Sequence, residues 1–272
     1  MPADMLPESS VPETDALSTE LRTRAIARLA ASNCITVHHP TPNMSAISRN
    51  SRVYALPHRL HWSGMDIAMN DFEYERRFFC RALPPELDDG EPMLIVQSYY
   101  VHDGNYALRV RLQTRGVRID MNADTDPIAV LRQYRDRFTE AFVTVKGPSV
   151  GGTRYEAERE IDACIAAELV MRGGRPIIKN RFSAWIGEDG WSLDIFGGAN
   201  APLVVAEAER SGPVTNLQIP SFCVTEITDQ ARFSNDGLAS RPFSQWAADF
   251  DAELHRDGPR FQTQFGRNRM GL

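Results

Sequence analysis

The stretch Glu73-Tyr74-Glu75-Arg76-Arg77-Phe78 places charged side chains at every second residue. The same spacing returns further along the chain with changing sign. The later pairs are Arg109/Arg111, Glu156/Glu158, Lys179/Arg181 and Glu207/Glu209. Because successive side chains of a β-strand point to opposite faces, each pair is expected on one face of a strand. Acidic pairs can hold hard cations and basic pairs can hold phosphate oxygens, so the pattern indicates a metal-dependent polyphosphate site.

Short strands joined by turns are expected along most of the chain from Phe72. The segments His102-Asp103-Gly104-Asn105 and Glu188-Asp189-Gly190 are typical hairpin connections. Gly147 to Gly152 is interpreted as a flexible turn and not as a phosphate-binding loop. The predicted strands cover residues 72–80, 93–101, 106–113, 141–147, 153–160, 177–186, 191–196, 202–210 and 221–228. Many short antiparallel strands with few helices predict a barrel or a sandwich.

Helices and flanking segments set the expected domain organisation. Asp126 is expected to cap a helix that starts at Pro127 and runs to about Glu140. Two further helices are predicted at residues 161–171 and 244–254. The predicted parts of the chain are an N-terminal extension (1–65), a tunnel-like barrel (66–240) and a C-terminal helix and tail (241–272).

The N-terminal extension carries few informative patterns. Its start is expected to be disordered, and Asp15 or Ser18 is expected to cap a helix that runs to about Ala31. His58 and His61 have a spacing seen in metal sites, but without cysteine partners a polar loop is the preferred interpretation. The tryptophans of the whole chain are interpreted as packing residues, and they are Trp62, Trp185, Trp191 and Trp246.

Composition excludes several classes of protein. The chain of 272 residues has a formal net charge of -6. A general nucleic-acid binder usually carries a basic excess, so nucleic acid is not an expected partner. No apolar run approaches about 18 residues, so no membrane span is expected, and the N-terminus does not resemble a secretory signal. The four cysteines lack a CxxC spacing and are expected to be reduced thiols in a cytoplasmic protein.

Two interpretations of the paired charges are open at this point. In an ordinary sandwich they would face water around an apolar core. Strand-long blocks of like charge repel unless opposite charge lies nearby, and a barrel with these faces inward would supply it. The candidate inward cations are Arg77, Arg109, Arg111, Lys146, Arg154, Lys179 and Arg181, and the candidate inward anions are Glu73, Glu75, Glu156, Glu158, Asp194, Glu207 and Glu209. Seven of each leave the interior near neutral, so divalent ions would be needed for a polyphosphate to enter.

The ordered series of these motifs resembles the CYTH superfamily, the triphosphate tunnel metalloenzymes. The stretch from Glu73 to Phe78 is similar to that family's E-x-E-x-K motif, and the resemblance covers about residues 70–240. The matches that follow in order are Arg109-Val110-Arg111, Thr144-Val145-Lys146-Gly147, Arg154-Tyr155-Glu156-Ala157-Glu158, Lys179-Asn180-Arg181, Asp194-Ile195-Phe196, Ala206-Glu207-Ala208-Glu209, and the closing segments 226–229 and 232–235. The resemblance implies a mainly β (α+β) fold, a closed eight-stranded antiparallel β-barrel with flanking helices.

The resemblance also implies roles for individual residues. Mg²⁺ or Mn²⁺ is the implied cofactor and a small-molecule triphosphate the implied partner, while a homodimer stays open. The implied metal ligands are Glu73, Glu75, Asp194, Glu207 and Glu209. The implied phosphate-binding residues are Arg77, Arg109, Arg111, Lys146, Arg154, Lys179 and Arg181, and the catalytic candidates are Glu73, Glu75, Arg77 and Lys146. Glu156 and Glu158 are interpreted either as orienting residues or as structural partners of the neighbouring cations.

Two features depart from the family pattern. Arg77 stands where lysine is usual, and because arginine keeps its proton at neutral pH, protonation of a leaving group by this residue is in doubt. The segment 115–140 is longer than in compact members, and its helix carries Arg132, Arg135 and Arg137. A lid or recognition surface and a solvated helix face are both interpretations of this insertion.

Three functions follow as hypotheses. The leading one is metal-dependent hydrolysis of a triphosphate compound, with inorganic tripolyphosphate preferred because no base-binding pocket is evident. The second is a class IV type adenylate cyclase, which makes cyclic AMP from ATP. The third is a non-catalytic module that binds a triphosphate or nucleotide.

Overall fold

The computed structural model describes residues 72–103 and 105–271. Several expectations lie outside these residues: the N-terminal extension with its helix to Ala31, the pair His58 and His61, Trp62 and Cys34. Among the described residues, Cys80, Cys164 and Cys223 form no disulfide bond. No helix within the described residues is long and apolar enough to cross a membrane.

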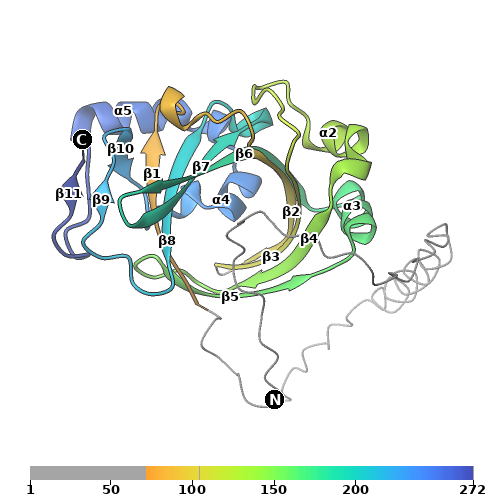
Figure 1. Cartoon of the computed structure of the whole chain (residues 1–272), viewed down its shortest axis with the longest axis horizontal. Helices are drawn as coiled ribbons and strands as arrows, with labels where there is room; N and C mark the ends of the chain where they lie inside the picture. Colours follow the sequence, from red (N-terminus) through yellow and green to blue (C-terminus); the bar gives the residue numbers. More distant parts are fainter. Residues whose placement is uncertain (1–71, 104, 272) are drawn as a thin grey trace, which may run out of the picture. The chain divides into compact units, whose positions relative to one another are not determined.

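Eight antiparallel strands form a closed barrel (Figure 1). The order around the barrel is β1-β5-β4-β3-β2-β6-β7-β8, and β8 pairs back with β1. These strands are β1 (Phe72–Cys80), β2 (Met93–Asp103), β3 (Tyr106–Thr114), β4 (Glu140–Lys146), β5 (Thr153–Glu160), β6 (Arg175–Ile186), β7 (Asp189–Phe196) and β8 (Val204–Arg210). The closed ring confirms the predicted barrel and shows that the sandwich interpretation was wrong.

Three shorter strands lie beside the ring. β10 (Cys223–Glu226) pairs with the last residues of β1, whereas β5 pairs with its first residues. β9 (Gln218–Ile219) and β11 (Arg269–Met270) form a separate parallel pair, which brings the C-terminal tail next to the segment that follows β8. These two short strands were not predicted from the sequence.

Large parts of the hydrophobic core lie outside the barrel wall. On β7, Trp191 and Leu193 are buried with Phe78 of β1 and with Leu217 of the segment after β8. Asp194, which follows Leu193 in the chain, belongs to the opposite face of the strand. The apolar faces of the strands are therefore covered from outside, and the charged faces line the lumen.

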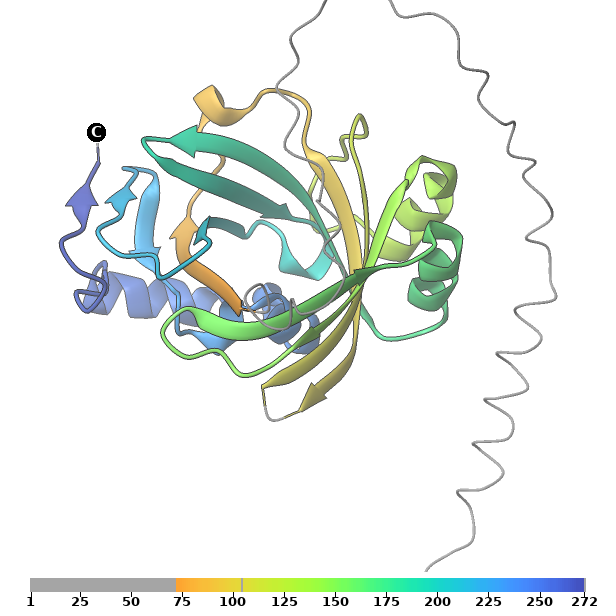
Figure 2. The ribbon, with the colours of Figure 1, turned by 60° about the horizontal axis from the view of Figure 1, so that its bottom comes forward.

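Two helices cover one side of the wall. α2 (Pro127–Gln133) and α3 (Ala163–Arg172) lie together outside β2, β3 and β4 in both views (Figures 1 and 2). Asp126 caps α2 as predicted, since its side chain accepts a hydrogen bond from the backbone N–H of Ile128. Arg135, just after α2, pairs with Glu168 of α3 at 2.8 Å. The arginine-bearing insertion is thus part of this outer layer.

The C-terminal segment forms the other cover. α4 (Asn235–Ser240) and α5 (Ala247–Asp257) pack with the end of β1 through a cluster of aromatic side chains. Phe233 has the rings of Trp246 and Phe250 as edge-on neighbours, with centroids 4.8 and 4.9 Å away. Aromatic pairs in this geometry add to the stability given by burial alone. This cluster therefore fixes the segment that contains α4 against the barrel.

Helix boundaries differ from the predicted ones for local reasons. α2 ends at Gln133 and not at Glu140, because a short 3₁₀ turn (Arg135–Arg137) follows and Glu140 already begins β4. The last helix begins at Ala247, later than predicted, because Phe243–Gln245 form a 3₁₀ turn. The six-residue α4 was missed, although Ser234 caps it by accepting from the backbone N–H of Gly237.

Candidate functional site

The strand register brings the paired charges to the inside of the barrel. Glu73 lies opposite Arg154, Glu75 opposite Glu209, and Arg77 opposite Glu207. Further round the ring, the facing pairs are Arg109 and Thr144, Lys146 and Glu156, Thr144 and Glu158, and Arg181 and Asp194. Directly opposite side chains on one face of an antiparallel pair are neighbours. The structure therefore places all fourteen predicted inward charges on one continuous inner surface.

One network joins β1, β4 and β5. The Lys146 ammonium contacts the Glu156 carboxylate and lies 3.2 Å from Glu73, while Arg154 Nε lies 3.1 Å from the same Glu73 oxygen. Burial raises the pKa of the Glu73 carboxyl, but Lys146 and Arg154 outweigh it and hold that pKa well below its usual range. Burial raises the pKa of Glu156 above its ordinary value. Glu73 is thus an anion held between two cations.

A second network positions the arginines of β3. Arg109 donates to Thr144 Oγ1 at 2.9 Å and to Glu158 at 2.9 Å, and it lies 3.3 Å from Glu156. Arg111 donates to both oxygens of Glu158, at 2.8 and 3.0 Å. Each guanidinium is therefore fixed by carboxylates on one side and can present its remaining donors to the lumen.

A third network lies on β6, β7 and β8. The fully buried Asp194 accepts from Lys179 at 2.5 Å and from two nitrogens of Arg181 at 2.6 Å, and Arg181 also contacts Glu207 at 2.6 Å. Burial and the neighbouring Arg181 charge lower the pKa of Lys179 to about 8. Burial works against ionisation of Asp194, but the two cations lower its pKa to about 2.

An acidic cluster stands between these networks. Burial and the charge of Glu73 raise the pKa of Glu75 to about 7, against the opposing effect of Arg77. Burial and the charges of Glu73 and Glu207 also raise the pKa of Glu209. Carboxylates that raise each other's pKa repel one another when ionised, and a bound cation relieves this repulsion.

The acidic cluster is the place where a divalent ion fits the donor set. Across residues 72–103 and 105–271, no three His, Cys, Asp or Glu side chains already converge on a common point. Mg²⁺ is commonly held by one or two carboxylates together with substrate phosphate oxygens, and not by a complete protein cage. Glu75 and Glu209, which face each other on adjacent strands, supply such a pair of carboxylates. Glu73 and Asp194 have closer cation partners, Lys146 at 3.2 Å and Lys179 at 2.5 Å, whereas Glu75 lies 3.5 Å from Arg77.

Three buried guanidinium nitrogens make no hydrogen bond among the described residues, the Nε atoms of Arg77, Arg111 and Arg154. Arg77 donates through another nitrogen to the carbonyl oxygen of Thr228 at 2.8 Å, and its Nε has only an ion-pair contact, at 3.5 Å, with Glu75. The Nε of Arg154 has a similar contact with Glu73, at 3.1 Å. Buried donors without hydrogen-bond partners are costly, so these nitrogens favour an incoming anion.

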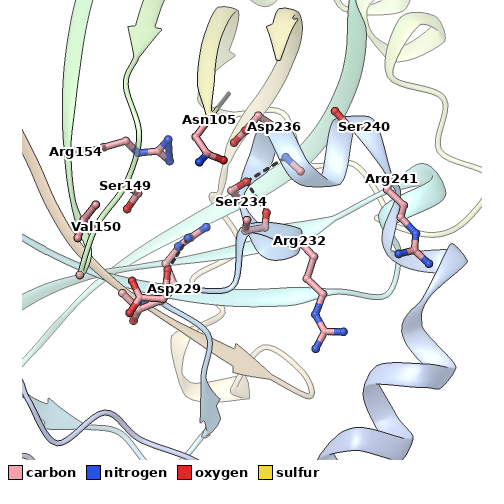
Figure 3. Close-up of a pocket in the computed structure, with 15 residues that line it drawn as sticks. Asn105, Ser149, Val150, Arg154, Asp229, Arg232, Ser234, Asp236, Ser240 and Arg241 are labelled. Atoms are coloured by element: carbon pink, nitrogen blue, oxygen red, sulfur yellow. Dashed lines mark hydrogen bonds between the residues drawn. The ribbon is translucent and has the colours of Figure 1, made fainter. Parts of the chain in front are cut away.

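One end of the lumen opens into a cavity of about 610 Å³ beside α4, here called the α4 mouth. Arg77 and Arg154 reach it from the barrel, and Arg232 and Arg241 line it from the C-terminal segment. Figure 3 shows Arg154 directed from β5 toward Asn105 and toward Asp236 on α4. Four arginines and two aspartates, Asp229 and Asp236, line this mouth, which gives it a basic excess.

The sequence analysis missed several lumen residues. Gln97 donates to Tyr99 Oη at 3.2 Å and to Asn235 Oδ1 at 3.1 Å, and Lys179 donates to the same Asn235 oxygen at 3.1 Å. The first residue of α4 is therefore tied to the lumen. Gln97 and Tyr99 share the two-residue spacing that revealed the charged pairs, so polar uncharged residues at that spacing were the available signal.

The packing interpretation of the tryptophans is only partly right. Trp191 and Trp246 are buried, as expected. Trp185, near the end of β6, is 80% exposed, so its interpretation as a packing residue was wrong. It lies at a lumen-facing position, since Lys179, Arg181 and Ser183 precede it at two-residue intervals.

Comparisons with known proteins place this geometry in context. No protein-family model matches the chain. A curated relative, the inorganic triphosphatase of Acetivibrio thermocellus, is 30% identical over 125 residues, which cover 45% of this chain and 78% of the relative. A crystal structure of the inorganic triphosphatase NE1496 has a TM-score of 0.37 and 23% identity over 61% of this chain and 93% of that chain. HpAC1 from Hippeastrum, whose structure is described as revealing a dominant triphosphatase activity, has a TM-score of 0.31 and 13% identity over 52% of this chain and 80% of that chain. The first of these similarities carries the family assignment, because it spans most of the relative.

Proposed function

The chain belongs to the CYTH superfamily of triphosphate tunnel metalloenzymes, and on that premise we propose that it is a triphosphatase, an enzyme that hydrolyses a phosphoanhydride bond of a triphosphate compound. The observation that carries the proposal is the closed ring of ionic side chains on the inner face of the barrel. Phosphoryl transfer needs positioning and charge stabilisation more than covalent chemistry, and such a ring supplies both.

The cations of the ring are assigned to the phosphate chain. Arg109, Arg111 and Lys146 lie on the adjacent strands β3 and β4, and Lys179 and Arg181 lie on β6, which is separated from β3 by β2. The Nε donors of Arg77, Arg111 and Arg154, which make no hydrogen bond among the described residues, are counted with this group. Arginine can bind a phosphate through two parallel donors, which fixes the orientation of the phosphate group as well as its position. Together these residues would hold the chain straight for in-line attack by water.

The carboxylates have two assignments. Glu156 and Glu158 contact Lys146, Arg109 and Arg111, so they orient the cations that hold the phosphates. Glu75 and Glu209, with Glu207 beside them, are the residues that would hold Mg²⁺ or Mn²⁺. Glu73 and Asp194 stay predicted ligands, but their present cation partners would have to be displaced. When bound, the divalent ion would neutralise phosphate charge and lower the pKa of a water molecule.

Inorganic tripolyphosphate is the minimal substrate for this chemistry. Every lumen group assigned above acts on phosphate oxygens, on a divalent ion or on another lumen side chain, and none of them requires an organic substituent. The balance of seven cations and seven anions in the lumen further implies that tripolyphosphate enters together with divalent ions.

The test is a screen of purified protein against tripolyphosphate, ATP and thiamine triphosphate, with Mg²⁺, Mn²⁺ or EDTA. We expect release of inorganic phosphate from tripolyphosphate with either metal and none with EDTA, because the acidic cluster needs the ion. Cyclic AMP formed from ATP without phosphate release would indicate a cyclase instead. Calorimetric binding without turnover of any compound would indicate a binding module, and either of these results would contradict the proposal.

A further inference from the structure

The end of the lumen away from α4 opens into a second cavity, of about 750 Å³, here called the β6–β7 mouth. Its lining joins lumen charges to aromatic side chains. Arg181, Glu207 and Glu209 belong to the ionic ring, while Trp185 and Phe72 bring two exposed rings to the same cavity. A ligand in this mouth can therefore reach the acidic cluster and an aromatic surface at once.

Trp185 is exposed, but its indole lies against the neighbouring strand. It lies opposite Gly190 in the β6–β7 register. The six-membered part of its indole lies over that glycine, with Cη2 3.8 Å from the point where a Cβ would stand. Gly190 has no side chain of its own, so the indole rests against bare backbone and 80% of the residue stays open to solvent. An exposed indole is a large, flat apolar surface on which a planar ring can stack.

The spacing along β6 suits a ligand with a ring at one end and phosphates at the other. Trp185 lies four residues beyond Arg181, which corresponds to about 13 Å along a strand. That separation leaves room for a sugar between a stacked ring and a phosphate group near Arg181. The α4 mouth offers no such platform, because four arginines and no aromatic residue line it.

We propose that Trp185 is a stacking platform for the base of a nucleoside triphosphate, whose phosphate chain enters the lumen past Glu207 and Glu209. The inference rests on the proposed function and extends its substrate class from tripolyphosphate to nucleoside triphosphates. Tripolyphosphate would occupy the same lumen without using the platform. Trp185 is therefore a specificity residue for the organic end of the substrate, and its loss should leave phosphate binding intact.

Calorimetry on the full chain with Mg²⁺ tests this inference, using adenosine 5′-(β,γ-imido)triphosphate and inorganic imidotriphosphate as hydrolysis-resistant probes. Trp185→Ala should weaken binding of the nucleotide probe by about five- to hundredfold, the range that stacking on an aromatic side chain supplies. Trp185→Phe should retain most of the affinity, because it keeps a ring. Binding of the inorganic probe should change by less than about twofold in both variants, since no phosphate contact is lost.

Tyr106→Ala is the matched control, because Tyr106 is also exposed, at 57%, but lies at the start of β3, away from the β6–β7 mouth. It should leave both affinities unchanged. Equal losses for the two probes in Trp185→Ala, no loss for the nucleotide probe, or no nucleotide binding by the natural chain would each overturn the inference. Phosphate release from tripolyphosphate, measured on the same preparations, reports separately on the proposed function.

Discussion

Glu75→Gln is expected to lower kcat/KM for tripolyphosphate hydrolysis by about 10²- to 10³-fold at saturating Mg²⁺. Glutamine keeps the size of the side chain but removes one of two facing carboxylates, Glu75 and Glu209, that are assigned to the ion. Charge stabilisation by a bound metal contributes several kcal/mol to such reactions, and each 1.36 kcal/mol is about a factor of ten. Steady-state phosphate release over a range of Mg²⁺ concentrations measures the effect.

The control for this variant is Glu86→Gln. Glu86 is exposed on the 3₁₀ turn after β1, outside the barrel, so its loss should leave the rate unchanged. Thermal unfolding should confirm that both variants fold. A Glu75→Gln enzyme within about threefold of the natural chain would mean that the acidic cluster is not where the ion acts.

Asp194→Asn is expected to produce the largest loss of stability among the lumen variants. The carboxylate is fully buried between Lys179 and Arg181, and its removal leaves two buried cations without their main partner. Breaking a buried ion pair from one side costs about 3–5 kcal/mol in unfolding free energy. Urea denaturation in metal-free buffer measures it, and added tripolyphosphate should restore part of the loss by supplying negative charge to the same cations.

Asp88→Asn is the matched control, because Asp88 also accepts two hydrogen bonds from one arginine, Arg118, at 2.6 and 2.7 Å. That pair is exposed at the surface, so little change in stability is expected. If Asp194→Asn were as mild as the control without metal, and destabilising only when Mg²⁺ is present, Asp194 would act as a metal ligand and not as a structural countercharge.

The lumen face could be predicted from the sequence because its signal is local. A strand repeats every two residues, so Arg109/Arg111 or Glu207/Glu209 reveals one face of one strand without knowledge of its neighbours. The order of the motifs then implied the closed barrel that the structure shows. Tyr99 and Gln97 follow the same two-residue repeat, but they carry no charge, so the pattern of paired charges does not include them.

The partner of each charge could not be predicted, because it depends on register across strands. Nothing near Glu75 in the chain indicates that Glu209 lies opposite, or that Asp194 is shared by Lys179 and Arg181. The same holds for charges on the outer face. Arg76 sits between two lumen residues in the sequence, yet it is buried outside the lumen and donates to both oxygens of Glu226, at 2.9 and 2.7 Å.

The exposure of Trp185 could not be predicted from the sequence either. Tryptophan is buried on average, so a packing role was the reasonable expectation for each one. Only the hairpin geometry shows that the strand end carries this residue beyond the covered wall and over Gly190. Trp185 departs from the expected burial of tryptophan at the mouth of the tunnel, and such departures are expected at functional sites.

Anomalous diffraction from crystals grown with Mn²⁺ and inorganic imidotriphosphate tests the central claim most directly, because it locates the ion and the phosphate chain together. The predicted result is a manganese peak inside the barrel, bonded to carboxylate oxygens of Glu75 and Glu209, with phosphates lying between Arg109 and Arg181. A manganese ion and phosphate chain bound on the outer surface, with the lumen ion pairs unbroken, would contradict the account.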